Sequence, residues 1–451
     1  MSDDNPNRAS NEELVLERIS YLEKAIGNYG AQLRSLNDTV GQLQISNNSL
    51  VEQANNNNHR IEDILNTVNE LVQRAKESEN PERDTVDYQK ERDEDRHAAL
   101  LKTDFTASTE TIDEIFAKVN SDVFHQMQCA KGLKSGSIAD SLAEYKRILS
   151  QIVVENPELK FVTAHALSQL NLNGEKSYCQ IRHDVDADIV ACLPMAQIEA
   201  ELGVKSTYFL LHTAAYFGAW DISDIHPSAI YRRHEALADY YLQIQELGHE
   251  IAIHTDPLHL YQNLNVDGAE AVRSDIAWLR SQGIRISGTA PHNSPEEYGA
   301  SNSAIFVGRP VNYLLDSGSK GVVKNGKWAP LGVLDEKDLD LVYEADDINS
   351  PEHGMHVDYI SPTSKNKWWR VLKTPELMEW EEVRDERYDH YSKMDFWKYE
   401  LPDIYQSEDD FWLDSASISK TFSQRAPKII VLSIHPEHFG YRKNEEAFPR
   451  I

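Results

Sequence analysis

Apolar residues near the start of the chain recur at alternating steps of four and three, from Val15 to Ala75. A helix lying on a globular domain follows a period of 3.6 residues and would drift off such a strict seven-residue repeat. The spacing therefore predicts a parallel coiled coil over residues 14–76, preceded by a disordered tail at 1–13. Leu at most d positions and Asn47 at an a position favour a homodimer, whereas Asn57 at a d position leaves a trimer open.

Further along the chain, short apolar strands alternate with amphipathic helices that end at glycines. The alternation predicts successive βαβ units and a parallel α/β fold over about 155–451. The preceding segment, 77–154, begins with a charged, Pro-containing stretch and continues with helical patterns, so we interpret it as a linker and helical connector. The expected strands and helices, with their glycine stops, are 181–185, 194–202 (Gly203), 205–210, a helix ending at Gly248, 250–254, 269–280 (Gly283) and 284–288.

Two carboxylates stand close together at the end of the first of these strands, in the sequence Arg182-His183-Asp184-Val185-Asp186. Side chains alternate along a strand, so Asp184 and Asp186 are expected on one side and His183 on the other. Two neighbouring like charges need a cation or a shared proton. A divalent metal held by one carboxylate, with the other acting as base toward water, would meet that need.

Histidines follow three later apolar runs, at His254, at His292 in Pro291-His292-Asn293-Ser294, and at His435 in Leu432-Ser433-Ile434-His435-Pro436. The carboxyl ends of parallel strands lie along one rim, so these imidazoles are expected near the Asp pair. A histidine that ends a buried strand can also be a core residue. The ordered set nevertheless favours a shared site.

This ordered set, together with Thr207-Tyr208-Phe209 and Leu247-Gly248-His249-Glu250, resembles the polysaccharide deacetylase family, in the intracellular branch whose first motif is Asp-x-Asp. The resemblance covers about two-thirds of the chain. It implies a distorted (β/α) barrel and metal-dependent hydrolysis of the N-acetyl or related acyl amide of an amino sugar, in surface-glycan or nucleotide-sugar metabolism. Carried over to this chain, it implies that Asp184 is the general base, that Asp186 and His254 are metal ligands, and that His435 is the general acid.

The third metal ligand departs from the family pattern, in which two histidines four residues apart share a helix face. Here His254 and His259 are five apart, which on a regular helix would rotate one about 140° from the other. If Asp256 caps a helix that starts at Pro257, the two can still converge. His292 reaches the rim directly from a strand end, so we favour His292 and keep His259 as the alternative.

Other positions suit substrate binding. Arg182, Asn293 and Asp316 carry polar groups near the expected rim, and Asp316 ends an apolar run where it can bind sugar hydroxyls or orient His435. An insertion at about 366–412 is rich in Trp and Tyr, whose rings stack on sugars but equally often fill a core.

The composition of the chain limits its expected partners and cellular location. The 451 residues carry a net charge of −29, which disfavours nucleic acid and anionic lipid as partners. Three scattered cysteines fit a reducing compartment, and no signal peptide or transmembrane span is predicted, so we expect a cytoplasmic protein.

One carboxylate with two imidazoles suits Zn²⁺ best, with Co²⁺, Ni²⁺ or Fe²⁺ as alternatives. A different small amide, such as a formamide, is an alternative substrate. The competing hypothesis is a catalytically silent carbohydrate-binding or assembly module displayed on the coiled coil.

Overall fold

The computed structural model describes residues 100–129, 138–172, 176–222, 228–293, 298–309, 320–324, 327–349, 354–364, 367–373, 412–422 and 428–440. The chain divides into two compact units, 1–90 and 91–451, and all described residues belong to the second. The predicted tail and coiled coil at 1–76, and most of the aromatic-rich insertion, lie outside the described residues.

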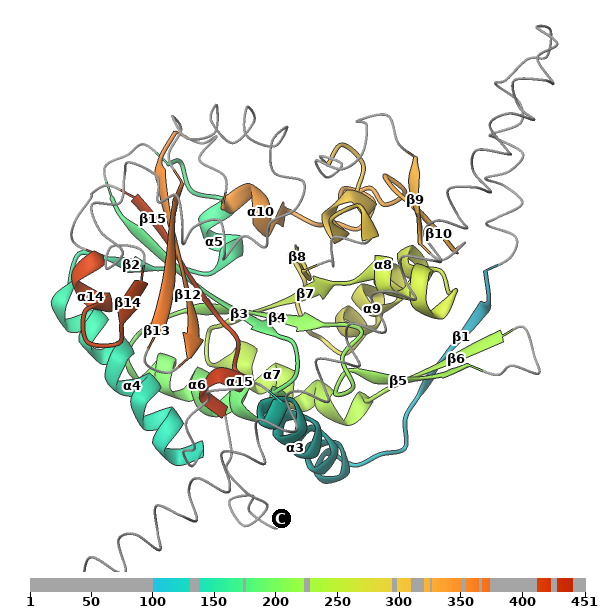
Figure 1. Ribbon diagram of the computed structural model, residues 1–451, viewed down its shortest axis with the longest axis horizontal. Coiled ribbons are helices and arrows are strands. Elements are labelled where there is room, and N and C mark those ends of the chain that lie inside the picture. Colours follow the sequence, from blue (N-terminus) through green and yellow to red (C-terminus); the bar gives the residue numbers. More distant parts are fainter. Residues whose placement is uncertain are drawn as a thin grey trace, which may run out of the picture. The chain divides into compact units, whose positions relative to one another are not determined.

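A ten-stranded sheet forms the centre of this unit (Figure 1). Its strands run in the order β11-β8-β7-β4-β3-β15-β12-β13-β14, with β2 beside β3. All neighbours from β11 to β12 are parallel, and β13 and β14 continue the sheet antiparallel. The strands are β2 (Lys160–Phe161), β3 (Tyr178–Val185), β4 (Ser206–Leu211), β7 (Glu250–Thr255), β8 (Gly288–Pro291), β11 (Tyr343–Glu344), β12 (His356–Ser364), β13 (Lys367–Lys373), β14 (Trp412–Asp414) and β15 (Lys428–Ile434).

The α/β class predicted from the sequence is therefore confirmed, but among the described strands the sheet is open and forms no closed barrel. Its two edges are β11 and β14. The antiparallel β12–β13–β14 meander extends the sheet beyond β15, so β14 rather than β15 is its edge strand on that side.

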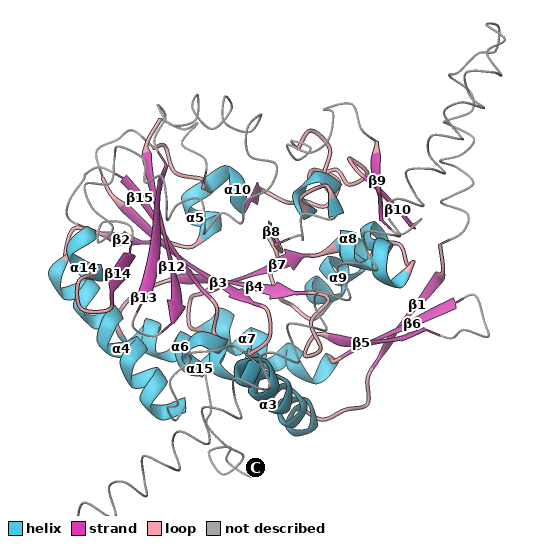
Figure 2. Cartoon of the chain, viewed as in Figure 1, coloured by secondary structure: helices cyan, strands magenta, loops and turns pink. Residues whose placement is uncertain are grey.

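Helices cover both faces of the sheet (Figures 1 and 2). On one face lie α4, α6 and α7, against the apolar side chains of β3, β4, β7 and β15. On the other face, α5 and α10 pack over small and aromatic residues such as Ala252, Ala290 and Tyr343. The helical elements are α3 (Ile112–Cys129), α4 (Ile138–Glu155), α5 (Ala164–Ser168), α6 (Ile189–Glu201), η1 (Glu235–Leu237), α7 (Ala238–Glu246), α8 (Pro257–His259), the π-helix η2 (Leu260–Leu264), α9 (Gly268–Ser281), η4 (Asn302–Ile305), α10 (Ala345–Ile348), α14 (Ile418–Thr421) and α15 (Glu437–Gly440).

Two small sheets complete the unit. Strands β1 (Lys102–Ala107), β5 (Gly218–Ile222) and β6 (Ser228–Arg233) form one, and β9 (Gly321–Lys324) pairs with β10 (Lys327–Pro330) in the other. Because β1 pairs with β6, and α3 and α4 contribute to the same apolar cores, the described part of the segment interpreted as a connector packs within the 91–451 unit. None of the described helices is both long and apolar enough to cross a membrane.

Helix α6 begins at Ile189, earlier than the start at Pro194 that the sequence predicted, so Pro194 lies inside the helix. An interior proline has no N–H for the carbonyl four residues before it, here Val190. The buried hydroxyl of Tyr240 lies 3.1 Å from that carbonyl and 2.9 Å from the carbonyl of Ile189, and it accepts the N–H of Leu193 at 3.0 Å. Tyr240 therefore satisfies backbone groups that the proline leaves open.

Removal of that hydroxyl by Tyr240→Phe is expected to destabilise the protein by about 1–3 kcal/mol, because the backbone groups lose a partner in a poorly hydrated site. Urea denaturation followed by circular dichroism measures this. Tyr298→Phe is the matched control for loss of a phenol hydroxyl. In the wild type, the hydroxyl of Tyr298 accepts a hydrogen bond from Asn263 at 2.7 Å. Equal denaturation midpoints for wild type and Tyr240→Phe would contradict the role.

A buried carboxylate, Glu199 of α6, ties the helix to the sheet. It lies 2.6 Å from Nε2 of His183 on β3 and accepts the hydroxyl of Tyr208 on β4 at 3.0 Å, and it also contacts Tyr145 and Ser206. The ring of His183 stacks on Tyr208. His183 thus points away from Asp184, as predicted. Burial alone would raise the pKa of Glu199, but His183 and the other partners lower it to about 2.

A carboxyl whose pKa is depressed in the folded state stabilises the fold above its unfolded pKa and loses that contribution as the pH falls toward the folded value. Between about pH 5 and pH 2, the wild type should therefore lose about 3 kcal/mol of stability through Glu199. Glu199→Gln cannot titrate and should show a flatter pH dependence over this range, from a lower starting stability at pH 7. Parallel stability–pH curves for the two proteins would refute this assignment.

Candidate functional site

Four parallel strands, β8, β7, β3 and β15, end at the same edge of the main sheet and bring four of the predicted residues together. Asp186, just after β3, is the common neighbour. Its carboxylate lies 3.4 Å from Nε2 of His254, 3.4 Å from Nε2 of His435 and 3.8 Å from Nε2 of His292. Parallel register explains this convergence, because each strand end contributes one side chain to the rim.

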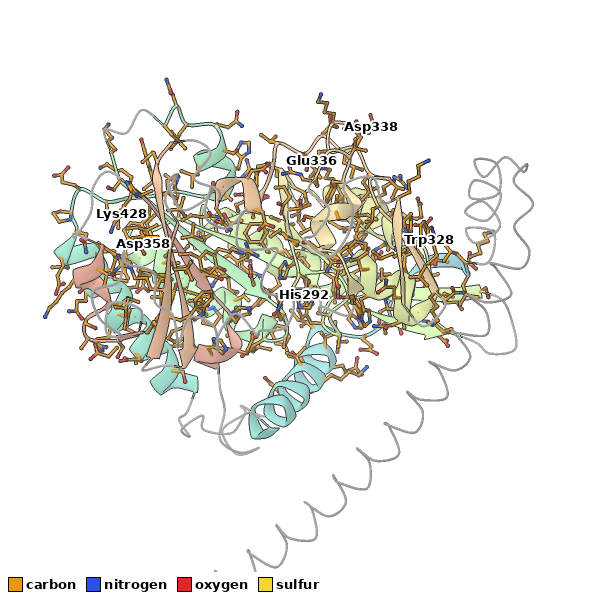
Figure 3. All side chains as sticks on the ribbon, turned by 45° about the horizontal axis from the view of Figure 1, so that its top comes forward. His292, Trp328, Glu336, Asp338, Asp358 and Lys428 are labelled. Carbon is orange, nitrogen blue, oxygen red and sulfur yellow. The ribbon has the colours of Figure 1, made fainter. Side chains whose placement is uncertain are left out.

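Access to this cluster differs among its members. The side chains of Asp186, His292 and His435 are 26%, 28% and 28% exposed, whereas His254 is only 2% exposed. A ligand can therefore reach the outer three side chains while His254 forms the floor. In Figure 3, His292 lies in the middle of the body, apart from the buried structural pair Asp358–Lys428.

Asp184 is buried beside this cluster and is held by its neighbour on the same strand face. Nε of Arg182 donates to Oδ1 of Asp184 at 2.6 Å, and Oδ2 of Asp184 lies 4.0 Å from Nε2 of His254. Burial would raise the pKa of Asp184, but Arg182, His254 and His435 lower it to about 2. At neutral pH the side chain is a fixed, ionised carboxylate. Both carboxylates of the Asp pair approach His254, as the strand alternation predicts.

His254 is held in one orientation. Its Nδ1 lies 3.0 Å from the carbonyl oxygen of Ala290 on β8, so Nδ1 carries the hydrogen, and Nε2, which points toward the two aspartates, carries none. Burial lowers the pKa of His254 below its ordinary value, in opposition to Asp184 and Asp186. A neutral imidazole with a free Nε2 is the form that binds metal ions.

His292 has a carboxylate behind it. Its Nδ1 lies 3.4 Å from Oδ2 of Asp256, and its ring meets that of His254 edge to face. Burial would lower the pKa of His292, but Asp256 and Asp186 raise it overall. The carboxylate–histidine pairing is the arrangement that commonly supports a metal-binding imidazole.

The donor types fit a divalent ion. Two ligands about 2.1 Å from a tetrahedral ion lie about 3.4 Å apart, which is the separation of Oδ1 of Asp186 from Nε2 of His254, whereas Oδ2 lies farther, 3.8 Å, from Nε2 of His292. Oδ1 of Asp186 is buried and has no hydrogen-bond partner among the described residues. As the described side chains stand, however, no three or more His, Cys, Asp or Glu residues are arranged to hold an ion. The chemistry of the donors, rather than their present positions, is what suits a metal.

The remaining predicted residues lie elsewhere or outside the described chain. His259 ends α8, and its Nδ1 accepts from Nδ2 of Asn263 at 2.9 Å. Of the two alternatives for a third ligand, His292 is therefore the one found beside Asp186. Asn293 is exposed, and Asp316 lies outside the described residues. Trp368 of the aromatic-rich insertion is buried in the core under the sheet.

Several residues near the site were missed. Asp256 precedes Pro257 as predicted, but its side chain makes no capping bond and instead faces His292. His212 follows β4, so the strand-end pattern that singled out His254 would also have found it. Glu437 follows Pro436, and burial together with Asp186 and Asp188 raises its pKa well above the ordinary range. Asn302 gave no signal, because only its tertiary contacts reveal it.

Comparisons with known proteins do not assign a function to this site. A scan against protein-family models finds no match, and a search of curated proteins finds no matching relative.

Proposed function

We propose that this protein is a metal-dependent deacetylase that hydrolyses the N-acetyl or a related acyl amide of an amino sugar. The observation that carries the proposal is the contact of Asp186 with three imidazoles from three strand ends, beside the ionised Asp184. A carboxylate base, a candidate metal set and a partly exposed imidazole acid are the groups that amide hydrolysis requires.

In this proposal Asp186, His254 and His292 hold the metal, which acidifies water and polarises the amide carbonyl when bound. Asp184 accepts the proton of the attacking water, and Arg182 keeps Asp184 ionised and in place. His435 donates a proton to the leaving amine. It follows β15, which flanks β3 on the side away from β7, the strand of His254. Zn²⁺ is the expected ion, with Co²⁺, Ni²⁺ and Fe²⁺ as alternatives.

The proposal extends to the architecture and setting. The open sheet would be a widened form of the distorted (β/α) barrel of polysaccharide deacetylases, and residues 14–76 would form the coiled coil that assembles a dimer or trimer. Arg182, Asn293 and Asp316 would contact the sugar, which would belong to surface-glycan or nucleotide-sugar metabolism in the cytoplasm.

A second candidate function is a carbohydrate-binding module without catalysis. It is favoured by the arrangement of the described His, Cys, Asp and Glu side chains, because no three of them are grouped so as to hold an ion.

One experiment separates the two functions. Protein loaded with zinc is incubated with a panel of N-acetylated amino sugars and nucleotide-linked N-acetyl sugars, and released acetate is measured with and without a chelator. The deacetylase releases acetate that the chelator abolishes. Binding of a sugar, by calorimetry, that is unaffected by chelator and gives no acetate would support the module instead.

A further inference from the structure

Asp256 lies directly behind His292 and is held from three sides. Its Oδ1 accepts Nδ2–H of Asn302 at 3.0 Å, and its Oδ2 accepts the hydroxyl of Thr213 at 3.1 Å and lies 3.4 Å from Nδ1 of His292. The Asp256 side chain is 8% exposed. These contacts join the loops after β4, β7 and β8 at the back of the candidate site.

An ionised carboxylate can only accept hydrogen bonds, and each ring nitrogen of His292 faces one: Oδ2 of Asp256 lies 3.4 Å from Nδ1, and Oδ2 of Asp186 lies farther, 3.8 Å, from Nε2. The nearer carboxylate favours the hydrogen on Nδ1 in the neutral ring. Its Nε2, which faces Asp186, is then a bare acceptor. We propose that Asp256 is a positioning residue that determines which ring nitrogen of His292 faces Asp186, and that Asn302 fixes the orientation of Asp256.

Asn302 can fix this orientation because its own amide cannot turn over. Its Oδ1 accepts the N–H of Leu258 at 3.0 Å, and its Nδ2 donates to the carbonyl of His292 at 3.0 Å as well as to Asp256. A flipped amide would place a donor against the N–H of Leu258 and an acceptor against two oxygens. Asn302 therefore always presents a donor to Asp256.

The backbone of Asp256 is fixed by a second histidine. Its N–H donates to Nε2 of His212 at 2.9 Å, so Nε2 carries no hydrogen and Nδ1–H donates to Asp275 at 3.0 Å. Arg233 in turn donates to Asp275 at 2.8 Å. This buried chain holds the Asp256 main chain while Asn302 holds its side chain.

The orientation of Asn302 makes a specific prediction for Asp256→Asn. A donor cannot face a donor, so the new carbonyl oxygen must turn toward Asn302 and the new NH₂ toward His292. The hydroxyl of Thr213 can reverse and accept. His292 then receives a hydrogen bond at Nδ1 and must carry its own hydrogen on Nε2, facing Asp186.

The test is the tautomer of His292 in the full chain, from two-bond ¹H–¹⁵N correlation spectra of histidine-labelled protein, recorded at increasing pH until the ring shifts no longer change. The His292 signals are identified by their loss in His292→Ala. We expect hydrogen on Nδ1 in the wild type and on Nε2 in Asp256→Asn. Hydrogen on Nε2 in the wild type, or on Nδ1 in Asp256→Asn, overturns the proposal.

A double variant tests the part played by Asn302. In Asp256→Asn/Asn302→Asp, the new carboxylate accepts from Leu258 and faces the new amide, which must turn its NH₂ toward residue 302 and its oxygen toward His292. The carbonyl of His292 loses the bond from residue 302, so the denaturation midpoint of the double variant is measured to confirm that it is folded. The hydrogen should return to Nδ1. Asp267→Asn, at the N-cap of α9, where Asn serves equally well, should leave His292 unchanged. A double variant that keeps the hydrogen on Nε2 refutes the role of Asn302.

A second readout rests on the proposed function. If His292 is a metal ligand, a hydrogen on Nε2 blocks it, so competition with a chromophoric chelator should show zinc binding about 10–100-fold weaker in Asp256→Asn and restored in the double variant. Absence of zinc binding in the wild type would count against the deacetylase and not against the tautomer assignment, which the spectra test alone. Tautomer reversal with unchanged zinc affinity would remove His292 from the metal site.

Discussion

Replacement of Asp184 by Asn should lower kcat for release of acetate from an N-acetylated sugar by about 10²–10⁴-fold. Asn has the same shape and can still accept the hydrogen bond from Arg182, but it cannot take a proton from water. The zinc content should not change, because Asp186 and the histidines remain. Acetate release and elemental analysis of the same samples measure both effects.

Asp221→Asn is the matched control, since Asp221 is an exposed aspartate that also pairs with an arginine, Arg232. It should retain wild-type kcat. Full activity of Asp184→Asn would mean that Asp184 is not the base. Loss of zinc together with activity would instead make Asp184 a ligand.

His435→Asn should lower kcat for the sugar amide by a similar factor, about 10²–10⁴-fold, because the leaving amine departs only after protonation. A leaving group that needs no proton removes this requirement. With p-nitrophenyl acetate as substrate, we expect the same variant to lose only about tenfold or less.

The neighbouring His438 offers a matched control, because its ring lies 5.4 Å from that of His435 and, among the described residues, it forms no ion pair with Asp186. His438→Asn should affect both substrates little. An equal loss of activity on both substrates in His435→Asn would contradict a proton-donor role and point to a role in binding.

The rim of the site was predictable from the sequence because a simple rule of parallel sheets governs it. Asp186, His254, His292 and His435 each stand at or just after an apolar run, and neighbouring strand ends bring such residues together. Nothing in the local sequence distinguishes a ligand from a bystander, which is why the sequence leaves His259 as an alternative to His292.

The residues behind the rim were not predictable in the same way. Asp256 followed by Pro257 is the usual pattern of a helix cap, and the helix does start there, but the tertiary neighbours Asn302 and His292 take over the carboxylate. Glu199 likewise occupies an ordinary helical position, and only the fold brings it to His183. Contacts between distant segments leave no periodic trace in the sequence.

The extent of the sheet also exceeded the prediction. The βαβ pattern correctly indicated parallel strands, whereas β12, β13 and β14 add an antiparallel meander within and beside the aromatic-rich segment. Trp368 shows why composition alone misleads, because its ring fills the core that the meander shares with α4 and α15. Closure into a barrel depends on strand tilt and register, which a hydrophobic pattern does not encode.

The most direct test of the central claim is bound metal per chain, measured by elemental analysis of the full protein purified without chelator, for the wild type beside His254→Ala. The site predicts about one equivalent in the wild type and almost none in the variant, with both proteins folded. No metal in the wild type, even after incubation with zinc and cobalt, would contradict the metallohydrolase.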